Sequence, residues 1–327
     1  MPGRVHGLVS VVIPAFDAER WIGAAIESAL AQTHPDVEVI VVDNGSTDGT
    51  VDVVGRMPGV RLVRCAIRGP SAARNAGLDA ARGEFVQFLD ADDLLAPDKV
   101  ERQLAALRAT GADIAWGPFT RFDDGRHANP FAEGRLVRPR LDASDLAASL
   151  IRSDGFVHLA AALFRRGPAV DGVRFDESCH VVEDVRYLIA LALGGARFVQ
   201  VDGPPGFALR EHDGPARASR VDGASFWASC VENAELVRRD GAHGDSLTAA
   251  RVNAIVGVLL GATEAFHAAR DPRLAAVLER LAQLDPRFSR RLRLPHRAVA
   301  PLLGYVNTLS LARAARRARD LVLGRAR

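Results

Sequence analysis

The chain has 327 residues, 48% of them hydrophobic, which is enough apolar material for one large domain or two with a buried core. Its formal net charge of +2 gives no electrostatic reason to expect a nucleic acid partner. Three widely spaced cysteines form no metal-ligand pattern, and we find neither a secretory signal pattern nor an uninterrupted apolar run of ~18 residues, so we expect a cytoplasmic protein with free thiols.

The first third of the chain alternates apolar strands with amphipathic helices. Strands are expected at residues 9–16, 37–43, 60–64 and 84–90. This alternation predicts an α/β fold with a mostly parallel sheet flanked by helices on both faces. Neither a GxGxxG motif nor a lysine-bearing phosphate loop follows the first strand, which argues against a dinucleotide-binding or P-loop protein.

Two of these helices carry signals at their ends. Ser46 or Thr47 is the expected N-cap of the second helix, because a hydroxyl oxygen can accept a hydrogen bond from a backbone amide of the first turn. Pro70 begins the third helix and Gly83 is expected to end it.

Three carboxylates come at the end of the strand at 84–90. Asp90, Asp92 and Asp93 would lie at the carboxyl end of a buried strand, where open α/β sheets bind their ligands. Clustered carboxylates repel one another unless a cation neutralises them, and Mg²⁺ and Mn²⁺ prefer oxygen ligands. The cluster predicts a divalent-metal site. Taken alone, it also fits an acidic loop before the helix that follows Pro97.

The motifs VSVVIPAF, VVDNGSTDGT and RNAGLDAARGEFVQFLDADD follow one another in this chain. In this order they resemble the nucleotide-sugar-binding half of the bacterial family 2 inverting glycosyltransferases, which have the GT-A fold. The resemblance covers about residues 8–100 and continues more weakly to about 220. It implies an enzyme that uses Mn²⁺ or Mg²⁺ to move a sugar from a nucleotide-diphosphate donor, usually a UDP-sugar, to a hydroxyl acceptor.

The resemblance assigns the nucleobase pocket to the ends of the first two strands. Pro14, Ala15 and Phe16 would line this pocket, and Asp43 would hydrogen-bond the base. Asn44 departs from the second Asp that many members carry. From the residues alone, Asp43 could simply cap the following turn.

The same resemblance assigns the ribose, the phosphates and the metal. Arg74 would lie near the base and phosphates, Asp90 would contact the ribose, and Asp92, with Asp93 beside it, would bind the metal. A solvated helix residue is the alternative for Arg74.

A second acidic pair, Glu183 and Asp184, begins a helix in the segment FDESCHVVEDVRYLIALALGG. In the family that the chain resembles, an acidic residue here removes the proton from the acceptor hydroxyl, which is a poor nucleophile until a base accepts that proton. We assign this role to Asp184, with Glu183 as the alternative. A favourable interaction with the helix dipole would also explain both carboxylates.

Further cationic and imidazole groups follow the pattern less closely. Arg210 and His212 are expected to meet the departing diphosphate, and the alternative is a mobile surface loop. His158, on an apolar strand expected at 156–164, is predicted to be a structural histidine.

The chain is expected to divide near residue 220. Residues 1–220 would form the catalytic domain, with a nucleotide-sugar-binding half at 1–117 and an acceptor half at 118–220, and 221–327 a C-terminal helical extension. The last segment carries six arginines beginning at Arg313. It could lie on the inner face of an anionic membrane as a peripheral contact, or form a solvated helix.

Two other functions share part of this pattern. A nucleotidyltransferase would also combine a nucleotide-binding sheet with an acidic metal site, although no Gly-rich cationic loop follows the first strand. A non-catalytic nucleotide-sugar-binding protein would be expected to lack acidic groups that this chain retains. The sugar, the acceptor and the linkage are not specified by these motifs.

Overall fold

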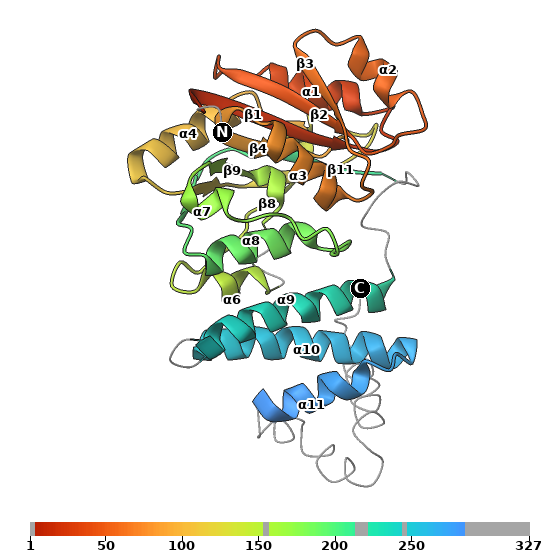
Figure 1. The fold of residues 1–327 in the computed structure, drawn as a ribbon, viewed down its shortest axis with the longest axis vertical. Coiled ribbons are helices and arrows are strands. Elements are labelled where there is room, and N and C mark those ends of the chain that lie inside the picture. The colour runs from red at the N-terminus through yellow and green to blue at the C-terminus, as the bar shows by residue number, and fades with distance from the viewer. Residues whose placement is uncertain (1–3, 153–156, 213–221, 244–246, 285–327) are drawn as a thin grey trace. The chain divides into compact units, whose positions relative to one another are not determined.

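The computed structural model of the protein describes residues 4–152, 157–212, 222–243 and 247–284 (Figure 1). The chain divides into two compact units, Met1–Val221 and Asp222–Arg327. Each unit has its own set of secondary-structure elements.

The first unit is built on a seven-stranded sheet with the strand order β10-β6-β9-β4-β1-β2-β3. Its strands are β1 (Val5–Ala15), β2 (Val37–Asp43), β3 (Val60–Arg64), β4 (Gly83–Phe88), β6 (Ile114–Trp116), β9 (Ala162–Arg165) and β10 (Phe198–Gln200). β9 runs antiparallel to β4 and β6, and the other pairings in this sheet are parallel. The predicted mostly parallel α/β sheet is therefore confirmed.

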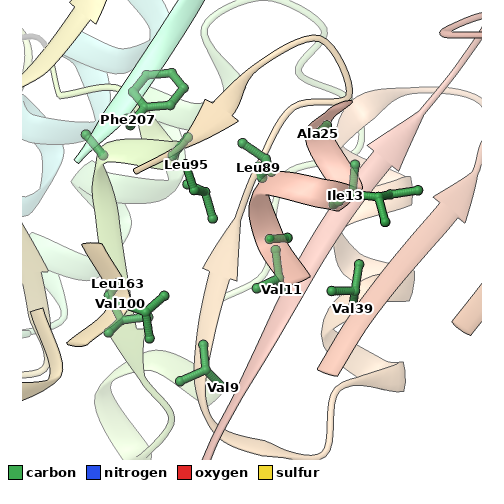
Figure 2. Packing of buried hydrophobic residues seen from close by; sticks show 14 of the residues in the cluster. Val9, Val11, Ile13, Ala25, Val39, Leu89, Leu95, Val100, Leu163 and Phe207 are labelled. Atoms are coloured by element: carbon green, nitrogen blue, oxygen red, sulfur yellow. The ribbon is translucent and has the colours of Figure 1, made fainter. Parts of the chain in front are cut away.

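Helices cover both faces of the sheet. The connecting helices are α1 (Ile22–Leu30), α2 (Thr50–Gly55), α3 (Pro70–Ala80) and α4 (Lys99–Thr110). Val11 and Ile13 of β1 belong to the buried cluster that also contains residues of α1 and α4 (Figure 2). Val12 points the opposite way, because side chains alternate along a strand, and it lies under α3. A Cβ atom at Gly77 of α3 would come within 2.2 Å of Val12 Cγ1, so only glycine allows this close packing.

A second sheet of four strands has the order β5-β11-β7-β8. Its strands are β5 (Leu94–Leu95), β7 (Phe119–Asp123), β8 (Arg135–Val137) and β11 (Phe207–Glu211). β11 pairs parallel with β7 and antiparallel with β5, which comes directly after the acidic turn at residues 90–93. This sheet was not predicted, and it brings residues near 210 next to residues near 93.

Short helices complete the first unit, and α8 is the longest of them. They are α5 (Pro130–Glu133), α6 (Leu146–Leu150), the 3₁₀ helix η1 (Leu159–Ala161), α7 (Pro168–Asp171) and α8 (Glu183–Leu193). The strand expected at 156–164 begins only at Ala162, because η1 occupies the residues before it.

The structure contradicts two expected helix ends. α2 begins at Thr50 after Gly49, and neither Ser46 nor Thr47 caps it. α3 ends at Ala80, and Gly83 instead begins β4. A Cβ atom at Gly83 would come within 2.6 Å of the Leu8 carbonyl oxygen, so this glycine serves strand packing.

The second unit contains the helices α9 (Gly223–His243), α10 (Ala249–Ala269) and α11 (Leu274–Leu284), as the predicted helical extension requires. α10 packs against both of the others. Among the described residues it is also the one helix long and apolar enough to cross a membrane. One such helix is weak evidence for a span, because core helices of soluble proteins can have the same length and apolar composition. The arginine-rich segment that begins at Arg313 lies outside the described residues.

Candidate active site

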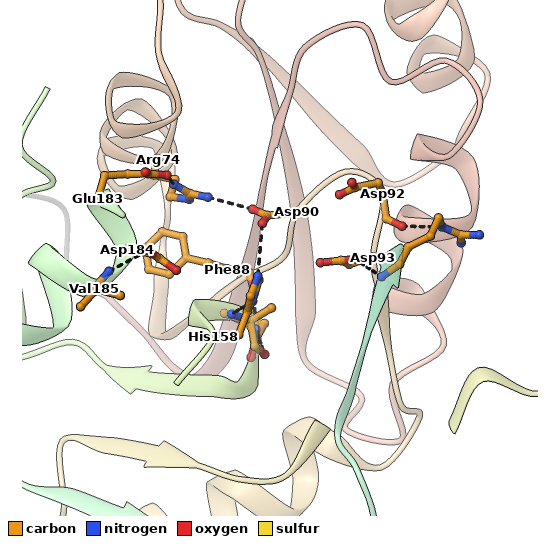
Figure 3. Close-up of polar contacts among 12 residues, drawn as sticks. Arg74, Phe88, Asp90, Asp92, Asp93, His158, Glu183, Asp184 and Val185 are labelled. Carbon is orange, nitrogen blue, oxygen red and sulfur yellow. Dashed lines mark hydrogen bonds and ion pairs between the residues drawn. The ribbon is translucent and has the colours of Figure 1, made fainter. Parts of the chain in front are cut away.

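A tight turn of acidic residues follows β4. It contains Asp90, Asp92 and Asp93, and the Asp93 backbone N–H donates to the Asp90 carbonyl oxygen (3.1 Å). Figure 3 shows the three carboxylates at the end of the strand, with His158 nearby. Potential ligand atoms on Asp90, Asp93 and His158 all lie within 4.8 Å of one another. The fold therefore concentrates negative charge at the sheet edge where the sequence places it.

Asp93 shows that this turn suits a cation. Its side chain is 1% exposed, and its Oδ2 atom has no hydrogen-bond partner in the described part of the chain. Burial, followed by the charges of Asp92 and Asp90, raises the pKa of Asp93 well above its ordinary value. A divalent cation would give Oδ2 a partner and offset this repulsion, and carboxylate oxygens suit Mg²⁺ and Mn²⁺.

β11 holds the acidic turn from the other side. The Arg210 backbone N–H donates to Asp93 Oδ1 (2.8 Å), and Arg210 Nε donates to the Asp92 carbonyl oxygen (2.6 Å). His212 Nε2 lies 2.9 Å from Asp92 Oδ2. Arg210 Nη1 also pairs with Asp124 Oδ1 (2.6 Å), so protein oxygens engage this guanidinium at two of its nitrogens.

Asp124 was not singled out in the sequence. It follows β7, accepts a hydrogen bond from Trp21 Nε1 (3.3 Å) and forms an ion pair with Arg20 Nη2 (2.7 Å). The Trp21 ring in turn lies 4.1 Å from the His212 ring between centroids. These contacts join the start of α1 to the Arg210 and His212 segment, and no local motif indicates them.

Arg74 of α3 links the acidic turn to the second acidic pair. Its Nη2 atom lies 2.9 Å from Asp90 Oδ1, and its Nη1 atom lies 2.7 Å from Glu183 Oε1. Burial opposes the charge, but Asp90 and then Glu183 raise the pKa of Arg74 above its ordinary value. With 5% of its surface exposed, Arg74 is not a solvated helix residue.

Asp184 follows Glu183 in the first turn of α8 but forms no ion pair with the described residues. Its Oδ1 atom accepts the Val185 N–H (2.8 Å). Burial, and then the neighbouring Glu183 charge, raises the pKa of Asp184 to about 7. Val182, just before this pair, has φ 52°, a left-handed conformation that is unusual for a β-branched residue. The backbone is thus strained where it delivers the two carboxylates.

The ends of β1 and β2 form a second edge of the site. Ala15 pairs with Asp43 in the parallel register, so these residues lie side by side. Asp43 is buried, and its Oδ1 atom accepts the Ser46 N–H (3.0 Å). Pro14 is half-buried, while the Phe16 ring is 39% exposed, with the Arg68 guanidinium 4.7 Å above it.

The hydrogen bonds of Asn44 explain why an amide stands here in place of the second Asp expected from the resemblance. Its Nδ2 atom donates to the Ile67 carbonyl oxygen (2.7 Å), and its Oδ1 atom accepts the Gly69 N–H (2.8 Å). An ionised aspartate could accept the second bond but could not donate the first. The amide therefore ties the end of β2 to the loop that leads into α3.

The sequence profile described as "Glycosyl transferase family 2" matches residues 10–171. These residues form a family 2 glycosyltransferase domain. The succinoglycan biosynthesis protein ExoO of Rhizobium meliloti (strain 1021) is 38% identical over 212 residues, covering 62% of this chain and 61% of that protein. The Escherichia coli glucosyltransferase WfaP, named for a UDP-Glc donor, is 36% identical over 100 residues, covering 30% of this chain and 41% of that protein. The chain thus spans less than two thirds of either relative.

The fold agrees with this family. The crystal structure of S. aureus TarS in complex with UDP-GlcNAc has a TM-score of 0.65 at 21% identity, covering 92% of this chain and 87% of that one. Within this chain, the matched range of the glycosyltransferase domain includes Asp43, Arg74 and the acidic turn. Glu183 and Arg210 lie beyond that range, and the structure pairs Glu183 with Arg74 and the Arg210 N–H with the Asp93 carboxylate.

His158, predicted from the sequence to be a structural histidine on a strand, lies at the N-cap of η1 and beside the acidic turn. Its side chain is 12% exposed, with Nε2 3.8 Å from Asp90 Oδ2, and its ring stacks on Phe207 at 4.7 Å between centroids. Its Nδ1 atom accepts the Ala160 N–H (3.3 Å), so in the neutral ring Nε2 carries the proton. Burial lowers the pKa of His158 and favours that neutral ring. In this tautomer Nε2 faces the carboxylates as a donor and has no lone pair for a metal.

Proposed function

We propose that the protein is a metal-dependent inverting glycosyltransferase that uses a nucleotide-diphosphate sugar, with UDP as the favoured nucleotide. The observation that carries the proposal is the buried Arg74 bridge. It engages Glu183 and Asp90 together, and it leaves the Asp184 carboxyl without an ion-pair partner among the residues that the structure describes. The UDP donors in the names of WfaP and of the TarS complex support the choice of nucleotide.

In this proposal Asp92 and Asp93 hold Mn²⁺ or Mg²⁺, with His212 beside Asp92. The cation would offset the charge of the donor diphosphate. Arg210 and His212 hold the turn in place through their bonds to Asp92 and Asp93. Asp90, fixed by Arg74, is left to contact the donor ribose.

The nucleobase is proposed to bind at the ends of β1 and β2. The exposed Phe16 ring offers a stacking surface, next to Pro14 and Ala15. The Asp43 carboxylate would accept an N–H of the base, in addition to the Ser46 N–H that it already accepts.

Asp184 is proposed as the general base. The acceptor oxygen attacks the anomeric carbon, the bond from that carbon to the phosphate oxygen breaks, and its electron pair leaves with the diphosphate. Asp184 takes the hydroxyl proton. A pKa of about 7 suits this role, because a base works best when its pKa lies near the working pH. A single displacement inverts the anomeric centre and forms no sugar–enzyme bond.

The proposed acceptor is a hydroxyl of a saccharide, as in the synthesis of a bacterial polysaccharide, glycolipid or glycoconjugate. The name of ExoO, a succinoglycan biosynthesis protein, supports this class. The acceptor would approach from the side of Asp184.

The test is donor turnover with a panel of UDP-, GDP- and dTDP-sugars, with Mn²⁺ or with EDTA. We expect Mn²⁺-dependent release of UDP and free sugar, and faster release with an acceptor. Asp184→Asn is the matched variant that keeps the metal and donor sites. Donor binding without any release would instead indicate a non-catalytic binding protein, and release of pyrophosphate would indicate a nucleotidyltransferase.

A further inference from the structure

The segment that carries His158 into the site is irregular and needs partners for its backbone. Between His158 and β9 the chain forms the single turn η1, and sheet pairing begins only at Ala162. The carbonyl oxygens of this segment are buried, and a buried carbonyl without a hydrogen bond is destabilising. The Gly117 N–H donates to the Ala161 oxygen (3.3 Å), and buried side chains supply further donors to this segment.

Three buried polar side chains supply donors to three successive carbonyls. Gln87 Nε2 of β4 donates to the Ala160 oxygen (2.9 Å), and Gln103 Nε2 of α4 donates to the Ala161 oxygen (2.8 Å). Lys99 Nζ of α4 donates to the Ala162 oxygen (3.1 Å) and also to Gln87 Oε1. We call Gln87, Lys99 and Gln103 the carbonyl clamp.

Lys99 is an unusual residue for this place. It is the single lysine among the 42 Lys and Arg residues, and it is 1% exposed. Burial lowers the pKa of Lys99 well below its ordinary value, and the structure shows no carboxylate bonded to it among the described residues. Its stem lies against Gly206, where a Cβ atom would come within 2.6 Å of Lys99 Cγ. Burial of the Lys99 amine is unfavourable, but it places one compact hydrogen-bond donor beside the carbonyl oxygens of the segment.

We propose that the carbonyl clamp positions His158, so that its Nε2–H faces Asp90 Oδ2 (3.8 Å) and is placed to donate to that carboxylate when the donor ribose binds. Two contacts hold the His158 ring itself: its Nδ1 atom accepts the Ala160 N–H, and the ring stacks on Phe207. The carbonyl clamp holds the backbone of residues 160–162 through hydrogen bonds to their carbonyl oxygens. This inference rests on the proposed function, because it gives Asp90 a partner in donor binding.

The test compares Lys99→Met and Gln103→Leu with Gln32→Leu as the matched control. Gln32, which follows α1, is also a buried glutamine whose Nε2 donates to a carbonyl oxygen, that of Ala96 (2.9 Å), but it does not touch the His158 segment. Circular dichroism and urea unfolding would show which variants fold. If Lys99→Met does not fold, Gln103→Leu carries the test.

The readouts are UDP affinity with Mn²⁺, the split between kcat and KM for the donor, and the NMR signal of the His158 ring, assigned with His158→Gln. We expect both clamp variants to shift or broaden the ring signal and to weaken donor affinity about tenfold, as for other supporting residues of metal sites. The change should raise KM more than it lowers kcat. Gln32→Leu should lose similar stability and leave the ring signal and donor affinity unchanged.

A double-mutant cycle completes the test. If Lys99 acts through His158, Lys99→Met should add little in the His158→Gln background. Wild-type ring signals and donor affinity in the folded clamp variants, or fully additive effects, would overturn the proposal. Failure of the wild-type protein to bind UDP with Mn²⁺ would count against the proposed function instead, while the His158 signal would still report on the clamp.

Discussion

The two carboxylates at the start of α8 should respond to substitution in opposite ways. Asp184→Asn keeps the size of the side chain but removes the proton acceptor, so transfer should fall by ~10²–10⁴-fold at saturating donor. Glu183→Gln leaves the acceptor in place and removes the negative charge that helps to raise the pKa of Asp184. The pKa of Asp184 should therefore fall in this variant, and the variant should stay active to a lower pH than the wild type.

The pH dependence gives the size of the effect. With a pKa of about 7, roughly 9% of Asp184 is ionised at pH 6 and about 91% at pH 8. Wild-type kcat should therefore rise about tenfold between these two values if proton transfer limits the rate. The kcat of Asp184→Asn should not rise with pH in this way. In Glu183→Gln the rise in kcat should be complete at a lower pH than in the wild type.

Stability provides an independent check on the same group. An acid whose pKa is raised by folding binds its proton more tightly in the folded state, so stability falls as pH rises from about 4 to about 7. Asp184→Asn removes this loss, and the variant should resist urea better than the wild type at pH 8. Its inactivity could then not be attributed to unfolding.

The assay is nucleoside diphosphate release from pH 5.5 to 9 at saturating donor and acceptor. Glu177→Gln, at an exposed acid outside the site, is the control for loss of one carboxylate. An inactive Glu183→Gln together with an active Asp184→Asn that keeps the rise with pH would refute the reasoning and make Glu183 the base.

Three further outcomes are expected. Asp92→Ala should abolish turnover and weaken Mn²⁺ binding without unfolding the protein, and near-wild-type activity with full Mn²⁺ affinity would remove Asp92 from the metal site. Asp43→Ala should weaken UDP binding by about 1.5–3 kcal/mol in calorimetry, the range for hydrogen bonds to charged groups, and an unchanged affinity would contradict the proposed base contact. Arg74→Leu should lower the free energy of unfolding by about 3–5 kcal/mol in urea titrations, because Asp90 and Glu183 would lose their buried partner. A loss below about 1 kcal/mol, as for surface ion pairs, would show that the bridge contributes little.

The sequence indicated the parts of the fold that depend on local pattern. β2 and β3 begin and end where their β-branched runs predicted, because such runs are bounded by turn residues. The second sheet was missed because β5 has two residues and β8 has three, too few to show an alternating pattern. What orders these strands is pairing with distant segments.

The same division holds for the site. Asp90, Asp92 and Asp93 are neighbours in the sequence, so one motif could predict their proximity. The Arg74–Glu183 pair joins positions 109 apart, and only the folded chain shows that, among the described residues, Glu183 has an ion-pair partner while Asp184 has none. The sequence predicted a structural histidine at His158 but not its place beside Asp90, since that place depends on η1 and on donors contributed by β4 and α4.

The return of β11 to the acidic turn sets an order of assembly. β1, β2 and β3 pair with their neighbours along the chain, and such nearby contacts close small loops. The bond from Arg210 to Asp93 joins positions 117 apart. During synthesis, the strands of the nucleotide-binding half can pair while β11 is still missing, so the turn is completed last. A nascent chain should therefore gain its nucleotide-binding edge before it gains a turn able to hold a cation.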